Sequence, residues 1–206
     1  MGNLTLEEFR QLPLLNRELI QNNKDGLVTL ALPKSHGSMF DVKTSGSSGK
    51  PLEAKATSVT STLYLAQTLR GHIWHKRDAS LKNISIRGRK GDRRVVRGRG
   101  WHPSSTGETI LLDKTIPPLE MLAFLKVENP YYLQCFPSTL VELLRVSKIE
   151  NFEPENLREI RTMSEILEPA LIRQAERQWG VKVTNIYSAM ELNIIAITCP
   201  DNPENM

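Results

Sequence analysis

Strand-like and helix-like segments alternate through the second half of this 206-residue chain, and this rhythm is the strongest constraint on its fold. Short apolar runs are separated by segments with helical spacing, and the connections are short. Such alternation predicts an α/β fold with a largely parallel sheet flanked by helices. The expected strands are residues 131–136, 157–163, 181–187 and 194–198, and the expected helices are residues 118–127, a stretch capped by Ser138, and residues 169–179, which Gly180 ends.

The first half of the chain is patterned less regularly. Apolar side chains at helical spacing predict a helix over residues 58–76. Residues 5–23 are expected to form a helical lead that breaks at Pro13. The remaining expectations are a strand over the weakly alternating residues 27–32, a segment at 39–43 that leads into a Gly/Ser loop, short strands at 83–86 and 110–112, and an irregular stretch between Arg87 and Gly107.

Composition and charge set broad limits on the function. The chain is 39% hydrophobic and 24% charged, which is ordinary for a globular domain, and its net charge of +4 permits anionic ligands without demanding nucleic acid. Cys135 and Cys199 are isolated cysteines, which favours a reducing compartment and buried thiols. The sequence contains no apolar run of membrane-spanning length and no signal-peptide pattern, so we expect a cytoplasmic protein without a membrane partner.

The Gly/Ser loop has the chemistry of a phosphate-binding loop. Glycines let backbone N–H groups approach an anion, hydroxyl groups add donors, and lysine adds a positive charge. The spacing differs from a Walker A motif, because two residues separate the glycines and proline follows the lysine. A flexible Ser/Gly linker explains the composition equally well. The segment is Thr44, Ser45, Gly46, Ser47, Ser48, Gly49, Lys50 and Pro51.

Two further polar segments follow expected strands, where ligands bind in open α/β sheets. The first is Tyr187, Ser188, Ala189, Met190 and Glu191. Its tyrosine could stack on a flat ring and its carboxylate could hold Mg²⁺, although a packed tyrosine and a solvated glutamate are the simpler interpretation. The second is Ser164 and Glu165, for which capping of the next helix is the competing interpretation.

Together and in this order, the three segments resemble the signatures of the adenylate-forming superfamily, which includes acyl-CoA synthetases, aryl-CoA ligases and adenylation domains. The resemblance is greatest to the phenylacetate–CoA ligase and capsule-biosynthesis-type branch. The resemblance covers most of the chain. The residues that resemble this branch are Leu-Gln-Cys-Phe-Pro-Ser-Thr-Leu at 133–140, Met-Ser-Glu-Ile-Leu at 163–167, and Cys199-Pro200.

The resemblance implies that residues 1–206 are part of the large N-terminal domain of an enzyme that uses ATP and Mg²⁺. A carboxylic acid would attack the α-phosphate to give an acyl-adenylate and pyrophosphate, and a thiol such as coenzyme A would then take the acyl group. Thr44 to Lys50 would hold the β- and γ-phosphates, Tyr187 would lie against adenine with Ser188, Ala189 and Met190 beside it, and Glu191 would bind Mg²⁺. Lys50 and Glu191 would be the catalytic residues, and Ser164 and Glu165 would line the nucleotide or acyl pocket.

The sequence also departs from the family's pattern. Ser188 stands where glycine is common, and Met190 stands where a Thr or Ser would contact the α-phosphate, so one hydroxyl donor is missing. The family's later Thr-Gly-Asp segment and its C-terminal lysine-bearing domain have no counterpart before Met206. We therefore expect little or no adenylation by residues 1–206 alone, and expect a complementing C-terminal chain or a homo-oligomer as partner.

An alternative function rests on the Arg/Gly-rich segment 87–101, which resembles segments that track nucleic-acid backbones. A solvated charged loop is the competing interpretation, since the segment has almost no aromatic side chains to stack on bases. His72, His75 and His102 also raise the question of a metal site. Without Cys or acidic residues at ligand spacing, surface or boundary histidines are the better expectation.

Overall fold

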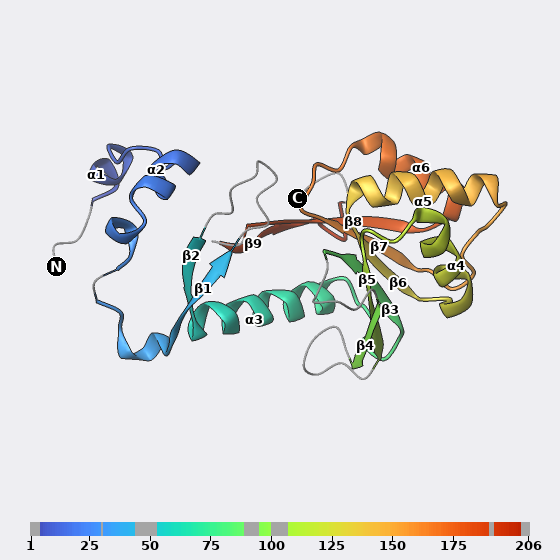
Figure 1. The fold of residues 1–206 in the computed structure, drawn as a ribbon, viewed down its shortest axis with the longest axis horizontal. Helices are drawn as coiled ribbons and strands as arrows, with labels where there is room; N and C mark the ends of the chain where they lie inside the picture. Colours follow the sequence, from blue (N-terminus) through green and yellow to red (C-terminus); the bar gives the residue numbers. More distant parts are fainter. Residues whose placement is uncertain are drawn as a thin grey trace. The chain divides into compact units, whose positions relative to one another are not determined.

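The computed structural model describes residues 5–29, 31–43, 53–88, 95–99, 107–189 and 192–202. The chain divides into two compact units, Met1–Thr62 and Leu63–Met206, and each is described by itself (Figure 1). None of the helices within these described ranges is long and apolar enough to cross a lipid bilayer.

The first unit begins with two short helices, α1 (Leu6–Arg10) and α2 (Arg17–Asn22), which confirms the predicted break around Pro13. The predicted strand over residues 27–32 is wrong. The 3-10 helix η1 (Asp25–Leu27) reaches into its start, and its other described residues lie in neither helix nor strand. A weak alternation of apolar and polar residues does not form a strand without a neighbouring strand to pair with. The next elements are η2 (Lys34–His36) and β1 (Met39–Lys43). β1 pairs with β2 (Glu53–Thr57).

Opposite charges face each other across the antiparallel pair β1–β2, and β2 was not predicted. Asp41 lies opposite Lys55 and Lys43 lies opposite Glu53, with side-chain ion pairs of 2.5 Å and 2.7 Å. Ala, Lys and Glu are disfavoured in strands, so β2 shows no strand pattern by itself. Directly opposed charges stabilise such pairs, and the matching charge alternation of the two segments is the signal that could have identified β2.

The second unit is built on a seven-stranded sheet of order β4-β5-β3-β6-β7-β8-β9. The five inner strands are parallel and the two edge strands, β4 and β9, pair antiparallel with their neighbours, which confirms the predicted largely parallel α/β fold. The strands are β3 (Asn83–Arg87), β4 (Val95–Arg99), β5 (Glu108–Asp113), β6 (Tyr132–Cys135), β7 (Glu159–Met163), β8 (Lys182–Ala189) and β9 (Asn193–Ile197).

The two faces of this sheet differ in chemistry because side chains alternate along each strand. One face is apolar and is covered by α4 (Pro118–Glu128), α5 (Pro137–Ile149) and α6 (Pro169–Trp179), which gather along one side of the sheet in Figure 1. This is the main hydrophobic core, and its buried strand residues are Ile84, Ile86, Ile110, Leu112, Leu133, Cys135, Ile160 and Val183.

The opposite face of the sheet is polar although it is buried. The second half of α3 (Ser58–Trp74) lies near this face, where Gly71 permits a close approach to β9. A Cβ atom at Gly71 would come within 3.0 Å of the Ile197 side chain. The buried polar residues of the inner strands on this face are Asn83, Ser85, Thr109, Asp113, Gln134, Glu159, Arg161 and Thr184.

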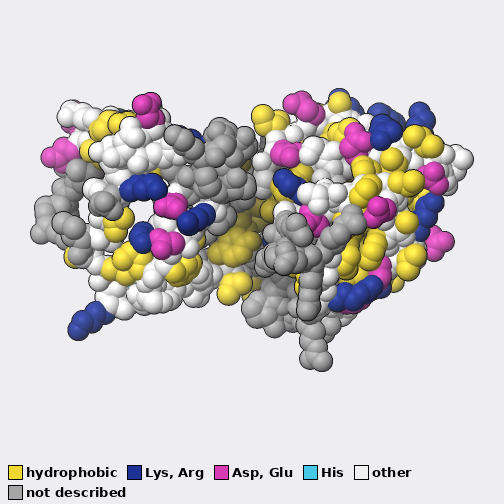
Figure 2. All heavy atoms as spheres, in the orientation of Figure 1, with side chains coloured by type: hydrophobic (Ala, Val, Ile, Leu, Met, Phe, Trp, Pro, Cys, Tyr) yellow, Lys and Arg dark blue, Asp and Glu magenta, His cyan; other side chains and the backbone are white. Residues whose placement is uncertain are grey.

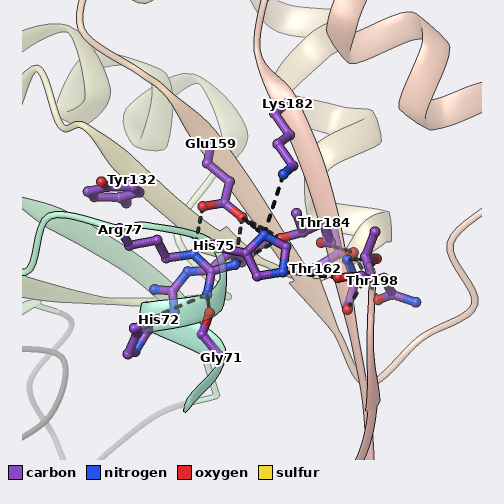
Figure 3. A network of polar contacts seen from close by, with 12 residues as sticks. Gly71, His72, His75, Arg77, Tyr132, Glu159, Thr162, Lys182, Thr184 and Thr198 are labelled. Carbon is purple, nitrogen blue, oxygen red and sulfur yellow. Dashed lines mark hydrogen bonds and ion pairs between the residues drawn. The ribbon is translucent and has the colours of Figure 1, made fainter. Parts of the chain in front are cut away.

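A buried ion pair fastens the end of α3 to the polar face (Figure 3). Arg77 donates two hydrogen bonds of 2.6 Å to the carboxylate of Glu159 and a third, of 3.1 Å, to the Gly71 carbonyl of α3. Thr184 of β8 donates to the same carboxylate at 2.7 Å. Burial alone would raise the pKa of Glu159, but the hydrogen bonds and charge of Arg77 outweigh it and hold that pKa below 4.5.

The prediction of surface or boundary histidines was wrong for His72, whereas His75 is a boundary residue whose side chain is buried. His72 is 4% exposed and the side chain of His75 is 1% exposed, because both lie on or directly after the part of α3 that is near the polar face. His75 Nε2 donates to the Thr198 carbonyl at 2.9 Å, and Lys182 Nζ lies 3.4 Å from Nδ1. These two contacts suit the neutral form of the His75 imidazole ring, because Nε2 donates and Nδ1 accepts. Burial, assisted by the positive charge of Arg77, lowers the pKa of His75 below 6.5.

Acid should therefore weaken the fold through His75. Because its pKa is lower in the folded chain than in the unfolded chain, the unfolded chain binds more protons as the pH falls below about 6.5, and stability falls with it. We predict that His75→Gln, which keeps an amide donor for Thr198, shows a smaller loss of unfolding free energy between pH 7 and pH 5 than the unchanged chain. Urea unfolding at both pH values measures this.

His36→Gln is the matched control, since His36 belongs to η2 in the other unit. It should leave the pH dependence as it is in the unchanged chain. If His75→Gln and His36→Gln behave alike, His75 is not the responsible group.

Candidate functional site

The carboxyl ends of β6, β7 and β8 lie side by side at one edge of the sheet, because these strands are parallel neighbours. The register pairs Cys135 with Thr162 and Met163 with Ile186. Ser164, which follows Met163, therefore lies at the level of Tyr187. The structure thus brings together two of the predicted segments, the one at Ser164 and Glu165 and the one that begins at Tyr187.

Glu165 binds the start of α5, across from the end of β7. Its carboxylate accepts hydrogen bonds from the backbone N–H of Ser138 at 2.9 Å and from the Ser138 hydroxyl at 3.0 Å. The prediction that Ser138 caps this helix was wrong, since Phe136 is the N-cap residue, Pro137 is the first helical residue, and no side chain of the N-cap makes a capping bond. A carboxylate from the neighbouring strand end satisfies the N-terminus of the helix instead.

Ser164 adopts a backbone conformation that is unusual for its type. Its φ angle is +67°, in the left-handed region, which costs an L-residue about 1–2 kcal/mol. The turn after β7 needs this conformation to lead the chain from Met163 toward Glu165 beside α5. Strained backbone of this kind is concentrated at functional sites, and here it coincides with a position chosen from the sequence alone.

The predicted segment that begins at Tyr187 continues a strand rather than following one. β8 was expected to end at Tyr187, but it extends to Ala189 because β9 returns along it as an antiparallel neighbour. The register shifts between Tyr187 and Ser188, which is a local bulge at this edge. The Tyr187 side chain is 58% exposed. Its ring is therefore presented at the strand edge rather than packed in the core.

The remaining predicted site residues lie outside the described residues. These are the whole phosphate-type loop, Thr44 to Lys50, together with Met190 and Glu191. His102 is also outside them. Among the residues that the structure describes, no group of three or more His, Cys, Asp or Glu side chains is placed to hold a metal ion.

The two cysteines differ in burial. Cys135 is fully buried, as predicted, and Cys199 is half-buried. Burial, together with the nearby negative charge of Glu165, raises the pKa of the Cys135 thiol to about 12. A thiol with so high a pKa is not a nucleophile at neutral pH, so Cys135 belongs to the core.

Arg87, the first residue of the Arg/Gly-rich segment, ends β3, and residues 95–99 of the segment form an edge strand, β4, which was not expected. Arg97 donates to Glu108 at 2.9 Å and also pairs with Glu128, so its charge is balanced by acids of the same unit. On the face turned to the viewer in Figure 2, Lys and Arg side chains lie among those of Asp and Glu. The nucleic-acid alternative gains no support from the described residues of this segment.

Solved structures share this fold, whereas no family model and no curated protein matches the chain. A 2-hydroxyisobutyryl-CoA ligase in complex with 2-HIB-AMP and CoA has a TM-score of 0.60 at 14% identity, over 86% of this chain and 40% of that chain. An anthranilate CoA ligase in complex with anthranoyl-AMP has a TM-score of 0.58 at 15% identity, over 81% of this chain and 32% of that chain.

A long-chain-fatty-acid-CoA ligase from Archaeoglobus fulgidus is similar as well, with a TM-score of 0.57 at 12% identity, over 80% of this chain and 34% of that chain. The chain thus spans well under half of the length of each of these ligases. It shares its α/β fold with a part of them, and at such low identity the likeness concerns the fold.

The contact between Glu165 and Ser138 can be tested by stability. We predict that Glu165→Ala lowers the free energy of unfolding by about 1 kcal/mol, because the start of α5 loses its carboxylate acceptor. Urea unfolding measures the change. Glu168→Ala is the matched control, since Glu168 is the N-cap of α6 but makes no side-chain capping bond. Equal effects of the two substitutions would contradict a capping role for Glu165.

Proposed function

We propose that this chain is part of an adenylate-forming ligase, which activates a carboxylic acid as an acyl-adenylate at the expense of ATP and transfers it to a thiol such as coenzyme A. The observation that carries the proposal is the fold shared with CoA ligases, two of them solved with acyl-AMP compounds. The ordered motifs of the sequence support the same conclusion independently. Residues 133–140, 163–167 and 199–200 favour the phenylacetate–CoA ligase-type branch.

The proposed share of this chain in the reaction is nucleotide binding. Thr44 to Lys50 would hold the β- and γ-phosphates through backbone N–H groups, hydroxyl groups and one lysine. Tyr187 would stack on adenine, and its 58% exposed side chain at the edge of the sheet supports this role. The left-handed backbone at Ser164, at the level of Tyr187, supports a binding function for the same edge.

Glu191 is proposed as the protein ligand for Mg²⁺. Mg²⁺ commonly takes one or two carboxylates and completes its coordination with water and substrate phosphates, so a single glutamate beside a nucleotide fits its chemistry. When bound, the ion would neutralise charge on the phosphates. Glu165, by contrast, is occupied with Ser138, so its proposed part is to shape the edge of the pocket.

Calorimetric titration with MgATP tests the nucleotide site. The unchanged chain should bind, and Lys50→Ala and Glu191→Ala should each weaken binding by about tenfold or more, because each removes one charge-assisted contact. Lys148→Ala and Glu176→Ala, exposed residues of α5 and α6, are matched controls and should bind normally. Absence of MgATP binding, or equal binding by all four variants, would reject the proposed site.

Met190 offers a gain-of-function test at the position where the family carries a hydroxyl group. Met190→Thr should strengthen MgATP binding by about threefold to tenfold, because one further hydrogen bond to a charged phosphate is added. Met190→Ala removes the thioether without adding a donor and should not strengthen binding. A similar gain in both variants would show that the size of the side chain, and not the hydroxyl group, is responsible.

A further inference from the structure

The order of the five parallel strands singles out one place on the edge of the sheet. They lie in the order β5-β3-β6-β7-β8, which reads 2-1-3-4-5 when these strands are counted along the chain. The strand order therefore reverses between β3 and β6. In open α/β sheets, ligands bind outside the carboxyl ends of the strands at such a reversal. We therefore expect a ligand contact at the carboxyl ends of β3 and β6, next to those of β7 and β8.

Lys114, the first residue after β5, has its side chain directed to this place. Its ammonium nitrogen lies 5.2 Å from the centre of the Phe136 ring. Phe136 directly follows β6, and β3 lies between β5 and β6. Two strand spacings of about 4.8 Å separate the two backbones, so the side chains of Lys114 and Phe136 approach each other across the carboxyl end of β3.

A short turn fixes the backbone that carries Lys114. The Lys114 N–H donates to the carbonyl of Arg87, the last residue of β3, at 2.7 Å. The carboxylate of Asp113 accepts hydrogen bonds from the backbone N–H and from the hydroxyl group of Thr115, both at 2.9 Å. Because the turn is held in this way, only the lysine side chain needs to be ordered when an anion binds.

The positive charge of Lys114 is available to a ligand. Lys114 is exposed, and within the described ranges of the chain it forms no ion pair. The carboxylate of Asp113 accepts from Thr115, and that of Glu165 accepts from Ser138. An aromatic face attracts an ammonium group but accepts none of its N–H groups as fully as an oxygen does, so the donors of Lys114 remain available.

The type of ligand follows from the chemistry of the edge. An ammonium group is a compact positive charge with three donors, which suits phosphate groups. Tyr187, the proposed support for adenine, belongs to β8, and β8 lies two strands, or about 10 Å, from β6. An adenosine phosphate has a flat ring at one end and negative charge at the other. One such molecule can therefore contact both places on the same edge.

We propose that Lys114 binds a phosphate group of an adenosine-containing ligand at the reversal between β3 and β6, with Phe136 holding its ammonium group in position. The inference rests on the proposed function, because it adds a residue to the same carboxyl edge. Neither residue belongs to the proposed phosphate loop or to the segment that begins at Tyr187. ATP and coenzyme A both carry phosphate groups on an adenosine, and the experiment separates these two sources.

Calorimetric titration of the full chain with MgATP, and separately with coenzyme A, tests the inference. Lys114→Ala should weaken the binding of at least one of them by about tenfold or more, because a charge-assisted contact is lost. The ligand that is weakened is the source of the phosphate group. Lys114→Arg keeps the charge and should lose less affinity. Adenosine, which has no phosphate group, should show the same affinity for the unchanged chain and for Lys114→Ala.

Two further variants locate the effect. Lys126→Ala is the matched control, since Lys126 lies 5.4 Å from the centre of the Phe152 ring but belongs to the last turn of α4, on the apolar face. It should leave the binding of both ligands unchanged. Phe136→Leu removes the aromatic face and keeps an apolar side chain. It should weaken the same ligand as Lys114→Ala, by about threefold, because the ammonium group is less well held.

The outcomes separate this inference from the proposed function. Normal binding of both ligands by Lys114→Ala, an equal loss in Lys126→Ala, or a loss of adenosine affinity in Lys114→Ala overturns the inference. If Lys50→Ala and Glu191→Ala lose MgATP binding while Lys114→Ala binds both ligands normally, the proposed function stands and only the inference fails. If the unchanged chain binds neither MgATP nor coenzyme A, the proposed function is rejected and the inference with it.

Discussion

The buried pair between Arg77 and Glu159 determines how the polar side of the sheet is organised. Its two hydrogen bonds of 2.6 Å join the chain directly after α3 to β7, which neighbours the central strand β6. Removing one partner would leave an uncompensated charge in the interior, which typically costs about 3–5 kcal/mol. The pair fixes the position of α3 over the face, and the position of α3 in turn buries His72 and the side chain of His75.

Much of the second unit could be predicted because local signals and global fold agree there. Pro118, Pro137 and Pro169 stand at the starts of α4, α5 and α6, where a missing N–H group costs nothing. Gly180 ends α6 with a φ angle of +64°. By contrast, β2 and β4 depend on their partner strands and on cross-strand ion pairs. Neither source of stability is visible within a single segment.

The strand end that carries Ser164 and Glu165 could be predicted from the sequence, but the contacts of these residues could not. A polar turn after a buried strand pointed to Ser164 and Glu165, and the structure confirms that β7 ends at Met163, directly before them, while their binding role stays a prediction. The partner of Glu165 is Ser138, 27 positions earlier, and a capping bond over such a distance has no sequence signal. The buried histidines were missed for a similar reason, since only the docking of α3 on the sheet explains their burial.

The short connections from β6 to β8 have a consequence for the order of folding. Each strand and helix between Tyr132 and Ala189 contacts elements that are close to it in sequence, so these contacts close small loops. Arg77 and Glu159 are 82 positions apart and close a much larger loop. We therefore expect the β6–β8 region to assemble first and α3 to dock late. In that case the strength of the ion pair governs how slowly the native chain opens, more than how fast it forms.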